Sequence, residues 1–283
     1  MVKPRRALAE PLTALAAWGA AAVVCLVFLW LAAEVARAGV GRLSLPFLIA
    51  PEEDAGRSGG IGPILVSTGL ILAVSMGASV VIGLPAAVLL AELSGAGRFG
   101  AAVRRSLDLL AGMPSIVFGL FGNAFFCGAL GLRFSILSGG LTLACMVLPL
   151  LIRTSEEALR GVPAAYREAA AALALSRTTL LFRVLLPAAL PGLLVGLVLG
   201  TGRALAETAA LVFTSGYVTR MPGSLLDSGR ALSVHIYDLS MNVAGGDASA
   251  GASALVLMVL ILALNGATEW LAGRWRRSGE ARP

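Results

Sequence analysis

Charge, lysine and histidine are all scarce in this sequence. Asp, Glu, Lys and Arg account for 13% of the 283 residues and hydrophobic residues for 58%, whereas soluble domains have about 25% and about 45–50%. The mean hydropathy is +0.88. These values exclude a disordered chain, a nucleic-acid-binding domain and an ordinary cytosolic enzyme. An all-α, polytopic helical membrane protein surrounded by membrane lipid remains.

The rare reactive residues limit the chemistry further. Lys3 is the only lysine, and a P-loop needs a lysine at the start of a helix. We therefore expect no nucleotide site and no cofactor in this chain, so any ATP must be bound by another subunit. One histidine, His235, is too few for a zinc site or a Ser/His triad. Cys25, Cys127 and Cys145 lie in apolar runs without metal-ligand spacing, so we expect neither a metal nor a disulfide.

Long apolar runs are the main positive signal. A helix needs about 20 apolar residues to cross a bilayer. The first run is longer than the core of a signal peptide, which favours an uncleaved anchor. Six runs predict about six transmembrane helices: Leu12–Ala33, Ile61–Leu90, Leu107–Leu130, Ile136–Ile152, Ala188–Thr214 and Ala252–Ala272.

The basic residues are distributed unevenly between the two sides of these spans. Fifteen of the 22 Lys and Arg residues fall on the side of the N-terminus and six on the other side. The positive-inside rule therefore predicts cytoplasmic N- and C-termini in the cytoplasmic (inner) membrane. The same bias explains the basic net charge without a nucleic acid partner.

The spans divide the chain into three parts. Residues 1–60 hold the N-terminal tail, the first span and an outer loop, and residues 61–273 hold a core of five spans with a cytoplasmic loop at 153–186. Residues 274–283 form a basic tail. Between the last two spans, Leu225–Leu239 is expected to form a helix near the outer surface.

The loop at 153–186 is rich in alanine, the best helix former, which predicts a short helix after Pro163. Tyr166, Ala169, Ala170 and Leu173 repeat at helical spacing and give it one apolar face. Ser176 is a plausible cap for a second helix. From the residues alone, the first helix either fits a groove of a partner or lies on the bilayer or on its own bundle.

The spacing within this loop is specific. Glu168-Ala169-Ala170, Ala174, Val184 and Leu186-Pro187 resemble the EAA loop of ABC importer permeases. This resemblance implies a type I ABC importer permease (MetI-like) fold. It also implies that Tyr166, Glu168, Ala169, Ala170 and Ala174 couple the chain to a separate ATPase. Alanine replaces the family's glycine at position 174, which suggests a less strained turn.

Two further stretches narrow the resemblance. Residues 113–122 and 202–210 are similar to segments of the A-type permease subunit of phosphate ABC importers, and the likeness covers roughly residues 60–272. It implies three kinds of partner: a second, C-type permease subunit, two ATPase subunits and an extracytoplasmic phosphate-binding protein. A sister importer for molybdate, tungstate, phosphonate or sulfate is the alternative. A channel or secondary transporter would not need the loop, and an intramembrane enzyme would need a nucleophile and a base that the sequence lacks.

The sequence places Arg203 midway along the fifth span, with Glu207 four residues further on. A charged residue at the centre of a membrane costs about 2.5–3.5 kcal/mol on insertion scales, so its presence needs a reason. Their spacing puts both on one helical face. They either form an ion pair within the helix, or Arg203 contacts an oxyanion in the translocation path while Glu207 tethers it. Ser115 has a weaker claim to line the same path.

Overall fold

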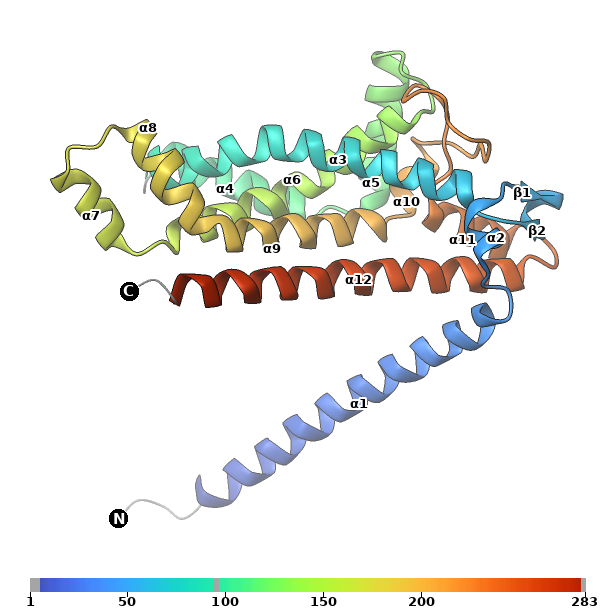
Figure 1. Cartoon of the computed structure of the whole chain (residues 1–283), viewed down its shortest axis with the longest axis horizontal. Coiled ribbons are helices and arrows are strands. Elements are labelled where there is room, and N and C mark those ends of the chain that lie inside the picture. Colours follow the sequence, from blue (N-terminus) through green and yellow to red (C-terminus); the bar gives the residue numbers. More distant parts are fainter. Residues whose placement is uncertain (1–5, 94–96, 281–283) are drawn as a thin grey trace.

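The computed structural model of the protein describes residues 6–93 and 97–280. Residues 1–5 and 281–283, which belong to the two predicted tails, lie outside it. Figure 1 shows a long helical bundle with a short helix, α7, at one end and a small irregular region at the other. The helices are α1 (Arg6–Val40), α2 (Leu45–Ile49), α3 (Gly62–Val88), α4 (Arg98–Ala111), α5 (Ser115–Gly122), α6 (Ile136–Arg160), α7 (Ala164–Ala172), α8 (Arg177–Leu180), α9 (Leu186–Leu205), α10 (Ala209–Val212), α11 (Leu232–Met241) and α12 (Asp247–Glu280).

Shorter elements complete the chain. Two strands pair as a small antiparallel hairpin around a 3₁₀ turn, and three π-helical turns extend or join the long helices. The strands and turns are β1 (Glu52–Glu53), η1 (Asp54–Gly56), β2 (Ser58–Gly59), η2 (Leu89–Leu93), η3 (Asn123–Ala129) and η4 (Leu181–Leu185).

Within residues 6–93 and 97–280, five helical segments are long and apolar enough to cross a membrane. A sixth candidate is a broken one, because Arg98–Ala111 and Ser115–Ala129 meet at 98°. The expectation of about six apolar spans therefore agrees with the structure, with the third span bent. The unbroken segments are Thr13–Val40, Gly62–Glu92, Ile136–Arg160, Arg177–Leu205 and Asp247–Ala267.

The prediction of one straight helix over Leu107–Leu130 is wrong. The chain leaves the helix at Gly112 and begins a new one at Ser115. Pro114 explains the break, since proline has no backbone N–H and its ring disfavours a helical conformation at Met113. Hydropathy alone does not register such a break because the residues on both sides are apolar.

The core lies where α3, α6 and α9 pack against one another. Small residues allow close approach: a Cβ atom on Gly140 of α6 would lie 2.6 Å from the side chain of Val74 in α3. The predicted fourth run was too short, since α6 continues to Arg160. The buried residues of this core include Ile71, Phe118, Ile136, Leu143, Met146, Val147, Leu151, Ala204, Ala210 and Leu211.

α1 stands apart from the bundle. Figure 1 shows it diverging from α12 after a contact near its C-terminal end. At that contact a Cβ atom on Gly39 would lie 2.6 Å from the carbonyl oxygen of Gly251, so the two backbones touch. The remaining described length of α1 exposes large apolar side chains such as Trp18 and Trp30. This surface suits lipid, in keeping with a membrane anchor.

The two ends of the bundle differ. The N-terminal end of α1 and the C-terminal end of α12 lie at the same end as α7 in Figure 1, and α11 and the β-hairpin lie at the other. α11 begins at Leu232, so the predicted helix over Leu225–Leu239 is wrong in its first half. The carbonyl oxygens of Leu225 and Asp227 instead accept hydrogen bonds from the amides of Leu137 and Ile136, which cap the start of α6.

Candidate functional site: two broken helices and an exposed loop helix

A second membrane helix is interrupted, close to the break between α4 and α5. The predicted fifth span, Ala188–Thr214, ends as a helix at Leu205, and the short α10 follows after the break. α5 packs on α10, with no room for a side chain between them: a Cβ atom on Gly119 would lie 2.9 Å from the Cα atom of Ala210. Met113 and Ala204, one beside each break, join the same hydrophobic cluster. The two breaks therefore meet in one part of the bundle.

Polar contacts fix the segments around the breaks. Asn123 donates from Nδ2 to the carbonyl oxygen of Phe213 at 2.7 Å, which holds η3 to the segment after α10. The hydroxyl of Ser233 in α11 donates to the carbonyl oxygen of Glu207 at 2.6 Å. Thr214 donates from Oγ1 to the carbonyl oxygen of Ala210 at 2.8 Å. Backbone groups released by the breaks are thus partly satisfied by side chains, as irregular backbone inside a membrane requires.

The structure places Arg203 in the last turn of α9, so the expectation that it lies midway along a span is wrong. Its side chain is exposed, and Glu207 lies half-buried beyond the helix end. Among the described residues no ion pair joins the two, because the helix that would align them ends at Leu205. Ser115 is half-buried at the first position of α5. A guanidinium therefore projects freely beside the α9 break.

The predicted docking helix forms and projects from the bundle as α7 (Figure 1). Tyr166 is 49% and Leu173 72% exposed, and Glu168 and Ala169 are also exposed. Ala170 is the exception, because it is buried and faces the chain's own bundle. The residues of the predicted apolar face therefore do not share one environment. Ala170 packs against the chain's own bundle, whereas Tyr166, Ala169 and Leu173 are exposed and accessible to a partner.

Arg167 holds α7 in place. Its guanidinium pairs with Glu92 of η2, with Nη2 2.6 Å from Oε1. It also donates to the carbonyl oxygens of Val162 at 2.9 Å and Leu159 at 3.0 Å. One side chain thus joins α7 to the ends of two membrane helices. The sequence argument used Arg167 only to assign orientation, and no local signal links it to a glutamate 75 positions away.

A buried carboxylate lies beneath this anchor. Glu156 of α6 is paired with Arg104 of α4 at 2.8 Å and with Arg160 at 3.0 Å. Both arginines also donate to the carbonyl oxygen of Leu90, at 3.0 and 3.2 Å. Leu90 lies in the π turn η2, where the regular i to i−4 pattern is interrupted. The ends of α3, α4 and α6 are therefore joined into one polar unit next to α7.

Ala174, between α7 and α8, adopts a left-handed backbone with φ of 49°. The expectation of a less strained turn is therefore wrong: the turn keeps the glycine-type conformation although the residue is alanine. Ser176 caps the next helix as predicted, with its hydroxyl accepting from the amide of Thr179. α8 and η4 continue directly into α9. The segment that connects α6 to α8 is therefore Gly161–Ser176, which contains α7 and is shorter than the predicted loop at 153–186.

Replacing Ala174 with glycine is expected to stabilise the protein by up to about 1 kcal/mol, since a left-handed conformation costs an L-residue about 1–2 kcal/mol and glycine loses somewhat more chain entropy. Uptake should be unchanged. Thermal unfolding of the purified assembly measures the effect. Ala174→Val is the matched control and should lower the midpoint, because a β-branched residue tolerates positive φ poorly. Equal midpoints for all three proteins would contradict the assigned strain.

A second polar cluster lies at the end opposite α7, outside the spans. His235 of α11 is buried, and its Nδ1 lies 3.7 Å from Oε2 of Glu52 and 3.4 Å from Nη1 of Arg230. Arg230 also pairs with Asp238 at 3.2 Å. Burial, aided by the positive charge of Arg230, lowers the pKa of His235 from 6.5 to about 4. The imidazole is therefore neutral at pH 7.

This cluster predicts an acid-sensitive fold. Because the pKa of His235 is lower in the folded chain than in the unfolded chain, the unfolded state takes up the proton first. The contribution of neutral His235 to the free energy of unfolding is intact above about pH 6.5. It is lost as the pH falls to about 4, by an amount on the order of 3 kcal/mol. Thermal midpoints measured from pH 7 to pH 4 should fall more steeply for the wild type than for His235→Gln. Parallel curves would contradict the prediction.

Comparison with known proteins assigns this architecture to a class. Residues 79–277 match the family of binding-protein-dependent transport system inner membrane components, and the chain belongs to that family. It is therefore a multi-pass permease subunit of an ABC importer. Such a subunit works with a partner permease, an ATPase and a substrate-binding protein. The predicted family is thus confirmed.

The individual relatives are more specific. The chain is 30% identical to the probable ABC transporter permease protein YqgI of Bacillus subtilis, over 89% of this chain and 90% of that protein. It is 33% identical to the phosphate transport system permease protein PstA 2 of Mycobacterium bovis, over 81% and 77% of the two chains. The corresponding PstA of Mycobacterium leprae is 32% identical over 77% and 71%.

A solved structure supports the fold. An inward-facing form of the MetNI methionine ABC transporter superposes with a TM-score of 0.60 at 20% identity, covering 74% of this chain and 93% of the other. At this identity the likeness concerns the fold alone. It confirms the expected all-α, MetI-like architecture.

Proposed function

We propose that this chain is the A-type permease subunit of an importer that moves inorganic phosphate across the cytoplasmic membrane. The observation that carries the proposal is the exposed Arg203 beside the α9 break, in a chain whose relatives include phosphate permeases. A guanidinium presents several donors in a fixed plane, which suits a tetrahedral oxyanion. Discontinuous helices are the usual setting for substrate sites in transporters.

The residues at the two breaks take different roles in this proposal. Arg203 contacts the anion, and Ser115 supplies a hydroxyl and the first amide of α5. Glu207 limits the positive charge of the empty path without forming an ion pair to Arg203. Gly119 keeps α5 and α10 in contact, so the two breaks move together.

The motor is a separate protein in this proposal. The chain has one lysine, at position 3, and the partner ATPase subunits bind the ATP, so this chain needs no cofactor. Tyr166, Glu168 and Ala169 form the docking face on α7, while Ala170 and Ala174 set its position. Two ATPase subunits, one C-type permease and an extracytoplasmic phosphate-binding protein complete the importer. Both termini of this chain are cytoplasmic, on the same side as α7.

The substrate can be tested by competition. The assembled importer is reconstituted with its binding protein, and uptake of radiolabelled phosphate is measured with excess unlabelled phosphate, sulfate or molybdate outside. Of the three unlabelled anions, only phosphate should reduce the uptake of radiolabelled phosphate. Stronger competition by sulfate or molybdate would assign the chain to a sister oxyanion importer and overturn the phosphate assignment while leaving the family assignment intact.

A further inference from the structure

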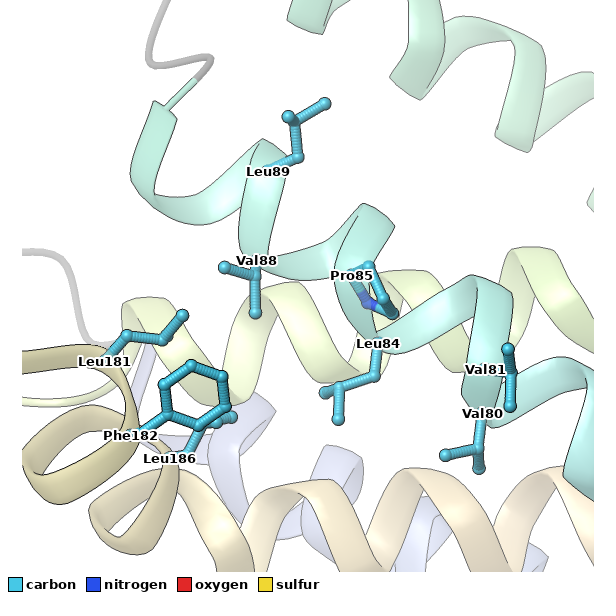
Figure 2. Close-up of a pocket in the computed structure, with 9 residues that line it drawn as sticks. All are labelled: Val80, Val81, Leu84, Pro85, Val88, Leu89, Leu181, Phe182 and Leu186. Atoms are coloured by element: carbon cyan, nitrogen blue, oxygen red, sulfur yellow. The ribbon is translucent and has the colours of Figure 1, made fainter. Parts of the chain in front are cut away.

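An apolar cavity of about 460 Å³ lies between α3 and the start of α9. A second cavity of about 580 Å³ lies beside it and is lined by four valine and leucine residues together with Glu92, Arg177 and Thr178. Of the two, only the second has polar lining residues, and it is called the polar cavity for that reason. Figure 2 shows the apolar cavity, with Leu84 and Val88 of α3 pointing toward Phe182 and Leu186. Every residue that lines it is apolar. Val88 and Leu181 line both cavities, so the two adjoin at these side chains.

The cavity arises from irregular helices on both of its sides. Pro85 lies within α3 and the π turn η2 follows it, while η4 is a π turn at the entry to α9. Proline and π turns widen or kink a helix locally. The two helices therefore leave a hollow that their own side chains do not fill. Phe182 remains 65% exposed beside it.

The α3 residues that line the two adjoining cavities cover a length of helix close to the thickness of one leaflet of a bilayer. The apolar lining begins at Val80 and the polar lining ends at Glu92 on the same helix. Twelve residues of helix rise about 18 Å, and one leaflet contributes about 15 Å of hydrocarbon. The polar cavity therefore opens where the spans Gly62–Glu92 and Arg177–Leu205 both end, at the surface that carries α7.

The charge at the mouth favours an anion. Arg177 and Thr178 line the polar cavity together with Glu92. Glu92 is already paired with Arg167, and in the part of the chain that the structure describes the guanidinium of Arg177 has no acidic or hydrogen-bonding partner. The mouth thus combines one uncompensated positive charge with the hydroxyl of Thr178, which also contacts the hydroxyl of Ser176 at 2.9 Å, beside an apolar cavity.

We propose that this space is a binding site for one anionic phospholipid of the inner leaflet. An acyl chain occupies the apolar cavity between α3 and α9, and the phosphate of the headgroup contacts Arg177 and Thr178. A free anion would not require the apolar part, and an apolar polypeptide segment would not require the arginine. The lipid lies directly behind the Arg167–Glu92 anchor of α7, so it also stabilises the region that transmits ATPase movement.

Native mass spectrometry of the assembled importer tests the site. The importer is purified from membranes that contain phosphatidylglycerol and phosphatidylethanolamine. The wild type should retain phosphatidylglycerol through delipidation, and Arg177→Gln should retain about tenfold less, the loss expected for one charge-assisted contact. Arg183→Gln is the matched control, because Arg183 is exposed on the same helix but does not line the cavities. Equal retention in all three, or equal retention of both lipids, would overturn the proposal.

A second measurement separates lipid from polypeptide. A photoreactive phenylalanine analogue in place of Phe182 should form an adduct with phosphatidylglycerol in the assembled importer. Val88→Phe, which narrows the junction of the two cavities, should reduce that adduct. A crosslink to the second permease or the ATPase in place of the lipid adduct would mean that a protein fills the cavity, and the lipid site would be wrong. Neither readout depends on which anion the importer carries.

Discussion

Phosphate uptake should fall by about tenfold to a hundredfold when Arg203 is replaced by glutamine, with co-purification of the ATPase unchanged. Glutamine keeps a similar length and a hydrogen-bonding end but removes the charge, and a hydrogen bond to a charged group is worth about 1.5–3 kcal/mol. Arg203 lies in the last turn of α9 and is not part of an ion pair in the described structure, so its loss leaves no buried charge uncompensated. Uptake into proteoliposomes and pull-down of the ATPase are measured on the same preparations.

The conservative variant Arg203→Lys is the matched control. It keeps the charge but loses the planar fork, so uptake should be intermediate. Glu207→Gln should have a smaller effect than Arg203→Gln, because the described hydrogen bonds of Glu207 are both made by its backbone, from its amide to Ala204 and from Ser233 to its carbonyl oxygen. A loss of ATPase binding equal to the loss of uptake would assign Arg203 a structural role and remove it from the substrate path.

Arg167→Gln should uncouple ATP hydrolysis from transport. The variant loses the pair with Glu92 and weakens the two contacts to main-chain carbonyl oxygens, so α7 remains helical but is no longer fixed to the membrane helices. We expect the ATPase to bind and hydrolyse ATP while uptake falls at least tenfold. The pair is partly exposed, so the loss of overall stability should be modest, about 1 kcal/mol.

Two comparisons make this result specific. Glu168→Lys changes the exposed docking face and should prevent ATPase binding itself, with membrane insertion intact. Arg105→Gln removes an exposed arginine of α4 that has no described partner and should leave both activities unchanged. Exchanging the charges in Arg167→Glu with Glu92→Arg should restore part of the coupling. Normal uptake by Arg167→Gln would contradict the anchoring role.

Much of the architecture was predictable because it rests on composition and spacing. A run such as Ile61–Leu90 predicts a membrane-spanning helix by its length and apolar composition, and α3 forms within a few residues of the predicted bounds. Ser176 caps the second loop helix because its hydroxyl satisfies a local amide. These features depend on neighbouring residues, which a sequence displays directly.

The breaks and the long-range pairs were not predictable in the same way. Met113-Pro114 is compatible with either a kinked helix or a broken one, and the local sequence does not distinguish the two. The end of α9 at Leu205 has no proline to signal it, and the contact of α5 with α10 beside it joins residues far apart in the sequence. Arg167 and Glu92 meet because α3 and α6 end side by side, and the exposure of α7 leaves Ala170 alone buried. Each depends on how helices assemble.

The most direct test of the account is ATP-dependent accumulation of phosphate in sealed proteoliposomes that contain this chain, its second permease and the ATPase, with the loaded binding protein outside. The account predicts accumulation against a gradient that requires ATP and stops when the ATPase is omitted. Phosphate flux that continues without the ATPase would contradict it, because the chain would then act as a channel or a secondary transporter.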